Sequence, residues 1–204
     1  MQTTDRKLTM LLIRHGETDF NRDGIIQGQT DIPLNGTGER EAAGLAALLK
    51  DRPIDKIYAS PLARAMKTAG CIAGPRGLVI EPVPALKEFD FGRWDGLRFG
   101  EIKERHALEW ASWMENWRTA EVPGGESFEA FFTRVVDAVE GIRKADGAGT
   151  VAIVTHSGCI RTILAHYITG NCAEGQWRFQ VETGSLAEIY FGRFGPSLLQ
   201  FNRK

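Results

Sequence analysis

The sequence predicts an α/β protein, a three-layer sandwich with a mostly parallel central sheet covered by helices on both faces. Two short apolar runs, at residues 8–13 and 151–155, have the composition of strands buried on both faces. The segments between them have the apolar spacing of amphipathic helices. Strands that alternate with helices favour a parallel sheet, because parallel neighbours need a crossover connection that a helix usually supplies.

The first half of the chain supplies three further elements. Apolar residues spaced as on one helix face follow Asn35, so we expect a helix to begin near that residue. Residues 54–59 form a second candidate strand. Ser60 and Pro61 have the residue types of a helix N-cap and first turn, and they predict a helix that ends near Ala73.

The second half of the chain contains the clearest helical pattern. Apolar residues recur every three or four positions over residues 128–142. A further helix is expected at 158–168, and closing strands are expected at 185–191 and 197–201. No linker, repeat or low-complexity segment interrupts the order of elements, so we expect one domain that spans residues 1–204.

One segment departs from this alternation. Residues 98–125 form a helical insertion between glycine-rich stretches, and Trp110, Trp113 and Trp117 lie on one face of it. Such an aromatic face is most often part of a core, and the flexible glycines at both ends also suit a lid over a pocket. Both interpretations stay open at this point.

Composition excludes several classes of protein. Of 204 residues, 43% are hydrophobic and 25% charged, which is typical of a folded soluble domain. The 25 Lys and Arg residues nearly balance the 26 Asp and Glu residues, so the net charge is −1. Binding of nucleic acid or of an anionic membrane by bulk charge is therefore not expected. Three scattered cysteines and the short apolar run at 8–13, too short for a signal peptide, favour a reducing, cytoplasmic location.

Two histidines follow the two apolar strands. Arg14 and His15 end the first strand, and His156 and Ser157 end the second. Ligands of open α/β sheets bind beyond the carboxyl ends of the strands, so these histidines can face one site. Arg64 falls in the first turn of the helix after Ser60-Pro61, and the N-terminus of a helix favours anions. Arg14 and Arg64 together offer two charged guanidinium groups that can bind phosphate oxygens.

The chain resembles the histidine phosphatase superfamily, also called phosphoglycerate mutase-like. Four blocks carry the resemblance in the family's order: LIRHGET at 12–18, SPLARAMKTA at 60–69, EFDFGRWDG at 88–96 and THSGCIR at 155–161. The resemblance implies that His15 is the nucleophile, that Arg14, Arg64 and His156 hold the phosphoryl oxygens, and that Glu88 protonates the leaving oxygen. It implies a phosphohistidine intermediate and no metal or cofactor.

Four more residues are candidate phosphate contacts: Asn21, Gln27, Gly28 and Ser157. For the two amides a purely structural role in a turn stays open. Cys172 and Arg178 have the spacing of cysteine-dependent phosphatases, but an acidic segment lies between them, so we reject that site. His106 and His166 lack metal-ligand spacing with carboxylates and are expected at the surface or in packing.

The predicted reaction is hydrolysis of a small phosphomonoester. The sequence that follows Glu88 is similar to that of the family's phosphatase branches. PGGESF at 123–128 is similar to a segment common in α-ribazole phosphatases. The tryptophan face favours a substrate with an apolar or aromatic leaving group, such as the nucleotide-like α-ribazole phosphate. Alternatives are a cofactor-dependent phosphoglycerate mutase, a sugar bisphosphatase, or a non-catalytic protein that binds phosphorylated ligands. The sequence leaves a homodimer open.

Overall fold

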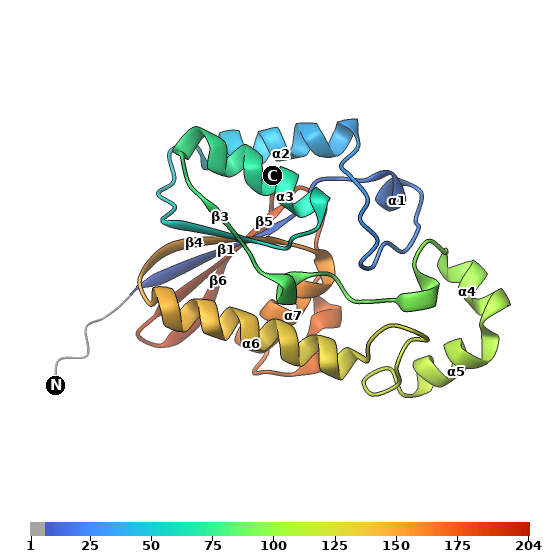
Figure 1. Ribbon diagram of the computed structural model, residues 1–204. Helices are drawn as coiled ribbons and strands as arrows, with labels where there is room; N and C mark the ends of the chain where they lie inside the picture. Colours follow the sequence, from blue (N-terminus) through green and yellow to red (C-terminus); the bar gives the residue numbers. More distant parts are fainter. Residues whose placement is uncertain (1–6) are drawn as a thin grey trace.

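A six-stranded sheet with helices on both faces forms the centre of the protein in a computed structural model, which describes residues 7–204 (Figure 1). The strand order is β3-β2-β4-β1-β5-β6, and β5 is antiparallel to both of its neighbours while the other pairs are parallel. The strands are β1 (Leu8–Arg14), β2 (Lys56–Ala59), β3 (Ile80–Pro82), β4 (Gly149–Thr155), β5 (Leu186–Gly192) and β6 (Gly195–Arg203).

The helices form two outer layers. In Figure 1, α2 and α3 cover one face of the sheet, and α6 and α7 cover the other. The α-helices are α1 (Asp19–Arg22), α2 (Gly36–Leu49), α3 (Ala63–Ala73), α4 (Phe99–Arg105), α5 (Ala107–Glu115), α6 (Phe128–Asp146) and α7 (Ser157–Ile168). Four short 3-10 helices connect them: η1 (Gly74–Arg76), η2 (Pro84–Leu86), η3 (Gly92–Trp94) and η4 (Ala173–Arg178).

The central strand β1 is buried on both faces. Met10 and Leu12 belong to the apolar cluster beneath α6 and α7, whereas Leu11 and Ile13 belong to the cluster beneath α2 and α3. Successive side chains of a strand point to opposite faces, so one apolar run serves both layers. The predicted three-layer α/β fold with a mostly parallel sheet is therefore confirmed. Residues 1–6 of the expected 1–204 domain lie outside the described part.

Most of the expected elements are present, and two details were wrong. The edge strand β3 was not expected, because it has only three residues and ends in Pro82. Ser60 is not the N-cap of the helix after it: α3 begins at Ala63 with Leu62 as its N-cap. The Ser60 side chain instead reaches the ring of His156.

The insertion lies at one end of the sheet and consists of α4 and α5 (Figure 1). The rings of Trp110 and Trp113 lie 5.8 and 5.9 Å from the ring of Trp94, which is 1% exposed. Both tryptophans are half-buried, and no residue of α5 is fully buried. The aromatic face is thus the outer layer of the apolar cluster.

None of the helices in residues 7–204 has the length and apolar character needed to cross a membrane.

Candidate active site

The site begins where two neighbouring parallel strands end. β1 and β4 are paired so that Arg14 lies opposite Thr155, and the next residues are His15 and His156. Their rings therefore emerge side by side, with centroids 5.1 Å apart and planes at 62°. His15 is 2% exposed and His156 is fully buried. The structure brings together the two histidines that the sequence placed at separate strand ends.

The ring of His15 has one free nitrogen. Its Nδ1 lies 2.7 Å from the carbonyl oxygen of Gly16. A carbonyl only accepts hydrogen bonds, so Nδ1 carries the proton and Nε2 keeps its lone pair. Burial, and then the charges of Arg14 and Arg64, lowers the pKa of His15 well below 6.5. His15 is therefore a neutral imidazole near pH 7, with a nucleophilic Nε2.

His156 is held by a hydroxyl rather than by a backbone group. Its Nε2 lies 2.8 Å from Oγ of Ser60, and its buried Nδ1 has no partner among residues 7–204. Burial, and then repulsion from His15 and Arg64, lowers the pKa of His156 well below 6.5. A buried polar atom without a partner costs free energy, which a phosphoryl oxygen at Nδ1 would remove by supplying that partner.

Two arginines give the site its positive charge. Arg64 is 1% exposed and donates to the carbonyls of Thr30 and Gly28, both at 2.8 Å. Arg14 donates to the carbonyl of Val181 at 2.6 Å, and burial lowers its pKa to about 10. Both guanidinium groups stay charged at neutral pH. Carbonyl partners fix their orientation without neutralising them, which leaves two cations for an anionic ligand.

Glu88 lies across from these cations, after η2. Its Oε1 accepts the N–H of Phe89 at 2.9 Å, and its Oε2 accepts the N–H of Gly158 at 3.1 Å. A Cβ on residue 158 would lie 2.3 Å from Oε1 of Glu88. The glycine in the first turn of α7 is therefore what lets this carboxylate approach the backbone.

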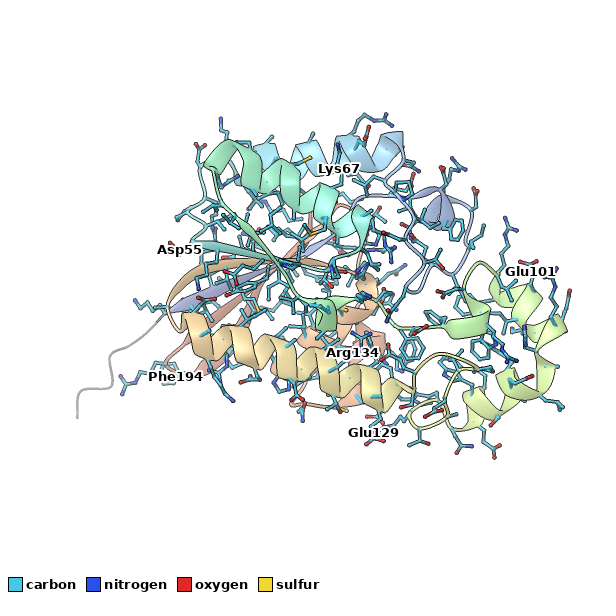
Figure 2. The ribbon with its side chains drawn as sticks, viewed as in Figure 1. Asp55, Lys67, Glu101, Glu129, Arg134 and Phe194 are labelled. Carbon is cyan, nitrogen blue, oxygen red and sulfur yellow. The ribbon has the colours of Figure 1, made fainter. Side chains whose placement is uncertain are left out.

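Arg134, which Figure 2 labels on α6, fixes the segment that carries Glu88 to this helix. Its guanidinium donates to the carbonyls of Ala85, Lys87 and Glu88 at 2.8–2.9 Å, and to both carboxylate oxygens of Glu126. Sequence analysis did not single out this pair. The glutamate within PGGESF was the available signal, but its partner lies eight residues further along the chain.

The secondary candidates have mixed roles. Oδ1 of Asn21 accepts the backbone N–H of Thr18 at 3.2 Å, and Oε1 of Gln27 accepts the Thr18 hydroxyl at 2.8 Å. Asn21 and Gln27 line a cavity that also contains His15 and the two arginines. Their side-chain oxygens are occupied by Thr18, so the NH₂ groups of the two amides remain available to a ligand. Gly28 has φ +46°, and a Cβ there would lie 2.0 Å from Oδ1 of Asp95. Its backbone and Asp95 already require glycine at this position.

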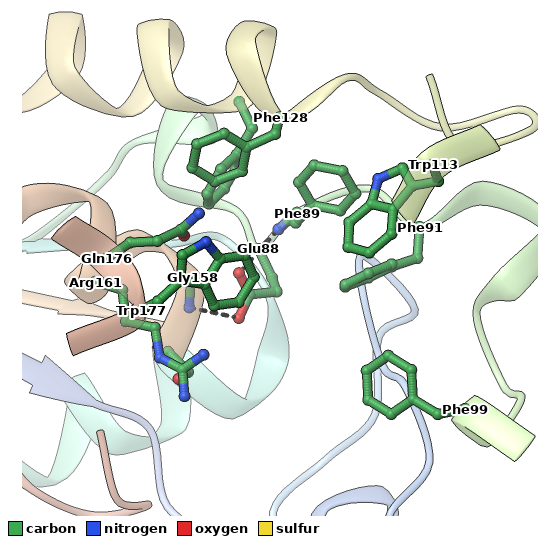
Figure 3. A pocket seen from close by; sticks show the side chains of 12 residues that line it. Glu88, Phe89, Phe91, Phe99, Trp113, Phe128, Gly158, Arg161, Gln176 and Trp177 are labelled. Carbon is green, nitrogen blue, oxygen red and sulfur yellow. Dashed lines mark hydrogen bonds between the residues drawn. The ribbon is translucent and has the colours of Figure 1, made fainter. Parts of the chain in front are cut away.

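Two adjoining cavities meet at the site. A cavity of about 380 Å³ is lined by Arg14, His15, Asn21, Gln27, Gly28 and Arg64. A second cavity of about 200 Å³ has mainly aromatic walls, which include Phe89, Phe128 and Trp177 (Figure 3). Four residues line both cavities: Glu88, Phe91, Phe99 and Ser157. Glu88 therefore lies where the cavity that contains the two arginines opens into the aromatic one.

The rejected candidates lie outside these cavities. Cys172 is exposed and precedes η4, and Arg178 is exposed at its end. His166 contacts Asn171 and Glu140 on the far part of α7. Sequence analysis gave Ser60 only the role of a helix cap and missed its contact with His156. It did not single out two polar residues of the aromatic cavity, Arg161 and Gln176.

Comparison with known proteins gives matches along most of the chain. The sequence profile of the histidine phosphatase superfamily (branch 1) matches residues 10–204. The adenosylcobalamin/α-ribazole phosphatase of Escherichia coli K12 is 31% identical over 182 residues, which are 89% of each chain. A metal-independent phosphoserine phosphatase of Arabidopsis thaliana is 39% identical over 161 residues, 76% of this chain and 66% of the relative. The crystal structure of the α-ribazole phosphatase from Shigella flexneri superposes with a TM-score of 0.89 at 31% identity and 96% coverage of both chains.

Proposed function

Because the chain belongs to branch 1 of the histidine phosphatase superfamily, we propose that this phosphatase hydrolyses small phosphomonoesters without a metal, through a phosphoryl group carried on His15. The observation that carries the proposal is the free Nε2 of His15, whose Nδ1 is committed to the Gly16 carbonyl. Arg14 and Arg64 lie beside it, and their guanidinium groups donate to backbone carbonyls rather than to carboxylates. The relative named as metal-independent supports the same chemistry.

In the first step, Nε2 of His15 attacks phosphorus. A P–N bond forms, the P–O bond to the alcohol breaks, and the protonated carboxyl group of Glu88 gives its proton to the leaving oxygen. In the second step, the Glu88 carboxylate takes a proton from water and the water oxygen attacks phosphorus. The P–N bond then breaks, and inorganic phosphate and neutral His15 are released. The covalent step divides one difficult displacement into two easier ones.

The remaining polar residues bind and orient the phosphoryl group. Phosphoryl transfer depends mainly on positioning and on positive charge around the equatorial oxygens. We assign this role to Arg14, Arg64 and the unpaired Nδ1 of His156, which donates an N–H when the Ser60 hydroxyl donates to Nε2. Asn21, Gln27 and Ser157 are secondary donors, and Gly28 supports the loop that holds Arg64.

The alcohol part of the substrate is assigned to the aromatic cavity. The cavity adjoins Glu88, which must reach the ester oxygen, so the leaving group extends between Phe91 and Phe99. Trp113 also lines this cavity, and residues 98–125 thus act as its lid-like cover in the proposed single domain. The names of relatives supply two candidate substrates, α-ribazole 5′-phosphate and phosphoserine. Trp113→Ala should lower the rate on aryl esters more than the rate on sugar phosphates.

The test is phosphate release from a panel of monoesters in the presence of a chelator. The panel contains p-nitrophenyl phosphate, α-ribazole 5′-phosphate, phosphoserine, 3-phosphoglycerate and a sugar bisphosphate. We expect wild type to release phosphate and His15→Ala to release none. His166→Ala is the matched control, because His166 contacts Glu140 away from the site, and it should keep full activity. Activity in His15→Ala, or loss of activity with the chelator, would overturn the proposal.

A further inference from the structure

Arg161 places a positive charge in the aromatic cavity, and its guanidinium has no hydrogen-bond partner among the described residues. It lies on α7, one turn after Ser157, and it lines the cavity (Figure 3). Among the buried and half-buried arginines of residues 7–204, it alone has a guanidinium with no hydrogen-bond partner, and its Nε is buried. The others donate to carbonyls or carboxylates: Arg14, Arg52, Arg64, Arg76, Arg134 and Arg143.

The one carboxylate that lines the same cavity, Glu88, attracts Arg161 by its charge but forms no hydrogen bond with it. Glu88 directs its oxygens to the N–H groups of Phe89 and Gly158. Charges interact more strongly beside apolar walls than in water, because the effective dielectric constant is lower there. A guanidinium in such a cavity whose N–H groups have no acceptor is therefore a site for an anion that arrives from outside.

A second unpaired donor lies on the same wall. Gln176, from η4, is 4% exposed, and its Nε2 has no partner within the described residues. Figure 3 shows Gln176 and Arg161 on one side of the cavity, with Trp113 and Phe99 on the other. Buried side-chain donors are nearly always paired in native proteins, so an unpaired one in a ligand cavity marks a contact that the ligand completes.

We propose that Arg161 and Gln176 form a subsite for a carboxylate on the alcohol part of the substrate. The inference rests on the proposed function, because it places the ester oxygen beside Glu88 and the carbon skeleton in the aromatic cavity. One guanidinium matches one negative charge in a bidentate pair, and a cavity of about 200 Å³ leaves room for a carboxylate beside a small carbon skeleton. The preferred substrate class is thus an acid-bearing phosphomonoester, rather than one with a neutral alcohol.

The experiment compares esters that differ only in the carboxylate. One pair is phosphoserine and phosphoethanolamine, and the other is 4-carboxyphenyl phosphate and its 4-carbamoyl analogue. Arg161→Gln should lower kcat/KM for a carboxylate ester by about tenfold to a hundredfold, mainly by raising KM. The value of kcat/KM for the matching ester without the carboxylate should change by less than about threefold. Arg161→Lys should restore part of the loss. The control Arg178→Gln removes an exposed charge at the end of η4 and should leave kcat/KM for both esters unchanged.

Each contrary result has a distinct meaning. The subsite is refuted if neither carboxylate ester is selectively affected, or if both members of each pair fall equally, which would place Arg161 at the shared phosphate centre. If wild type hydrolyses none of the esters, the proposed function has failed, and the subsite is then tested by calorimetric binding. Selective loss of phosphoserine binding in Arg161→Gln would still support it, whereas equal affinity for phosphoserine and phosphoethanolamine in wild type would refute it. Thermal unfolding of each variant confirms that it is folded.

Discussion

Replacing Arg134 with methionine should destabilise the protein and impair proton donation by Glu88. The change keeps an unbranched apolar side chain but removes the guanidinium and its five hydrogen bonds, three to carbonyls of residues 85–88 and two to Glu126. The side chains of Arg134 and Glu126 are only 24% and 16% exposed. Removing one partner of a buried ion pair costs about 3–5 kcal/mol, so for this slightly exposed pair we expect about 2–4 kcal/mol. The melting temperature should fall by about 4–16 °C.

The kinetic consequence depends on the leaving group. p-Nitrophenolate leaves without a proton, whereas an alkoxide needs one, so misplacing Glu88 should slow alkyl esters about tenfold more than p-nitrophenyl phosphate. Arg143→Met is the matched control, because Arg143 lies on the same helix and pairs with Glu140 away from the site. It should leave the ratio of the two rates unchanged. If Arg134→Met melts like this control, or slows both esters equally while folded, the positioning role assigned to Arg134 is refuted.

Three further predictions concern pH and backbone geometry. Burial, followed by two neighbouring arginine charges, holds the pKa of His15 well below 6.5, so kcat/KM should show no loss centred at that value as the pH falls. Burial raises the pKa of Asp95 from 3.8 to about 6, so the folded state binds this proton more tightly than the unfolded chain, and stability falls as the pH rises through that range. In urea denaturation, wild type should therefore lose stability relative to Asp95→Asn between about pH 4 and about pH 6, and a constant difference would contradict the raised pKa. Gly28→Ala should lower the free energy of unfolding by about 1–2 kcal/mol more than Gly24→Ala, because both glycines have positive φ but a Cβ at residue 24 meets open space.

The buried strands β1 and β4 and the two histidines that follow them could be predicted because their signals are local. An apolar run that ends in polar residues identifies a buried strand and its carboxyl end, and this placed His15 and His156. The helix over residues 128–142 was equally clear, because its apolar residues recur with helical period and lie on its buried side. The family motifs then drew attention to Glu88, which no spacing argument had singled out.

The parts that could not be predicted depend on contacts between distant segments. Arg134 is one of many arginines in the sequence, and only the folded chain brings it to the carbonyls of residues 85–88. Ser60 has the chemistry of a helix cap, but its hydroxyl bonds to His156, 96 residues away. The guanidinium of Arg161 lacks a hydrogen-bond partner only in the context of the folded cavity, and a sequence does not record which side chains lack such partners.

The most direct test of the mechanism is detection of the phosphorylated enzyme. Wild type and Glu88→Gln, mixed with p-nitrophenyl phosphate and quenched in alkali, are analysed by mass spectrometry of the intact protein and its peptides. We predict one added phosphoryl group on His15, with more of it in Glu88→Gln, because water is activated poorly in that variant. Turnover with no adduct in either protein, or an adduct on a residue other than His15, would contradict the account.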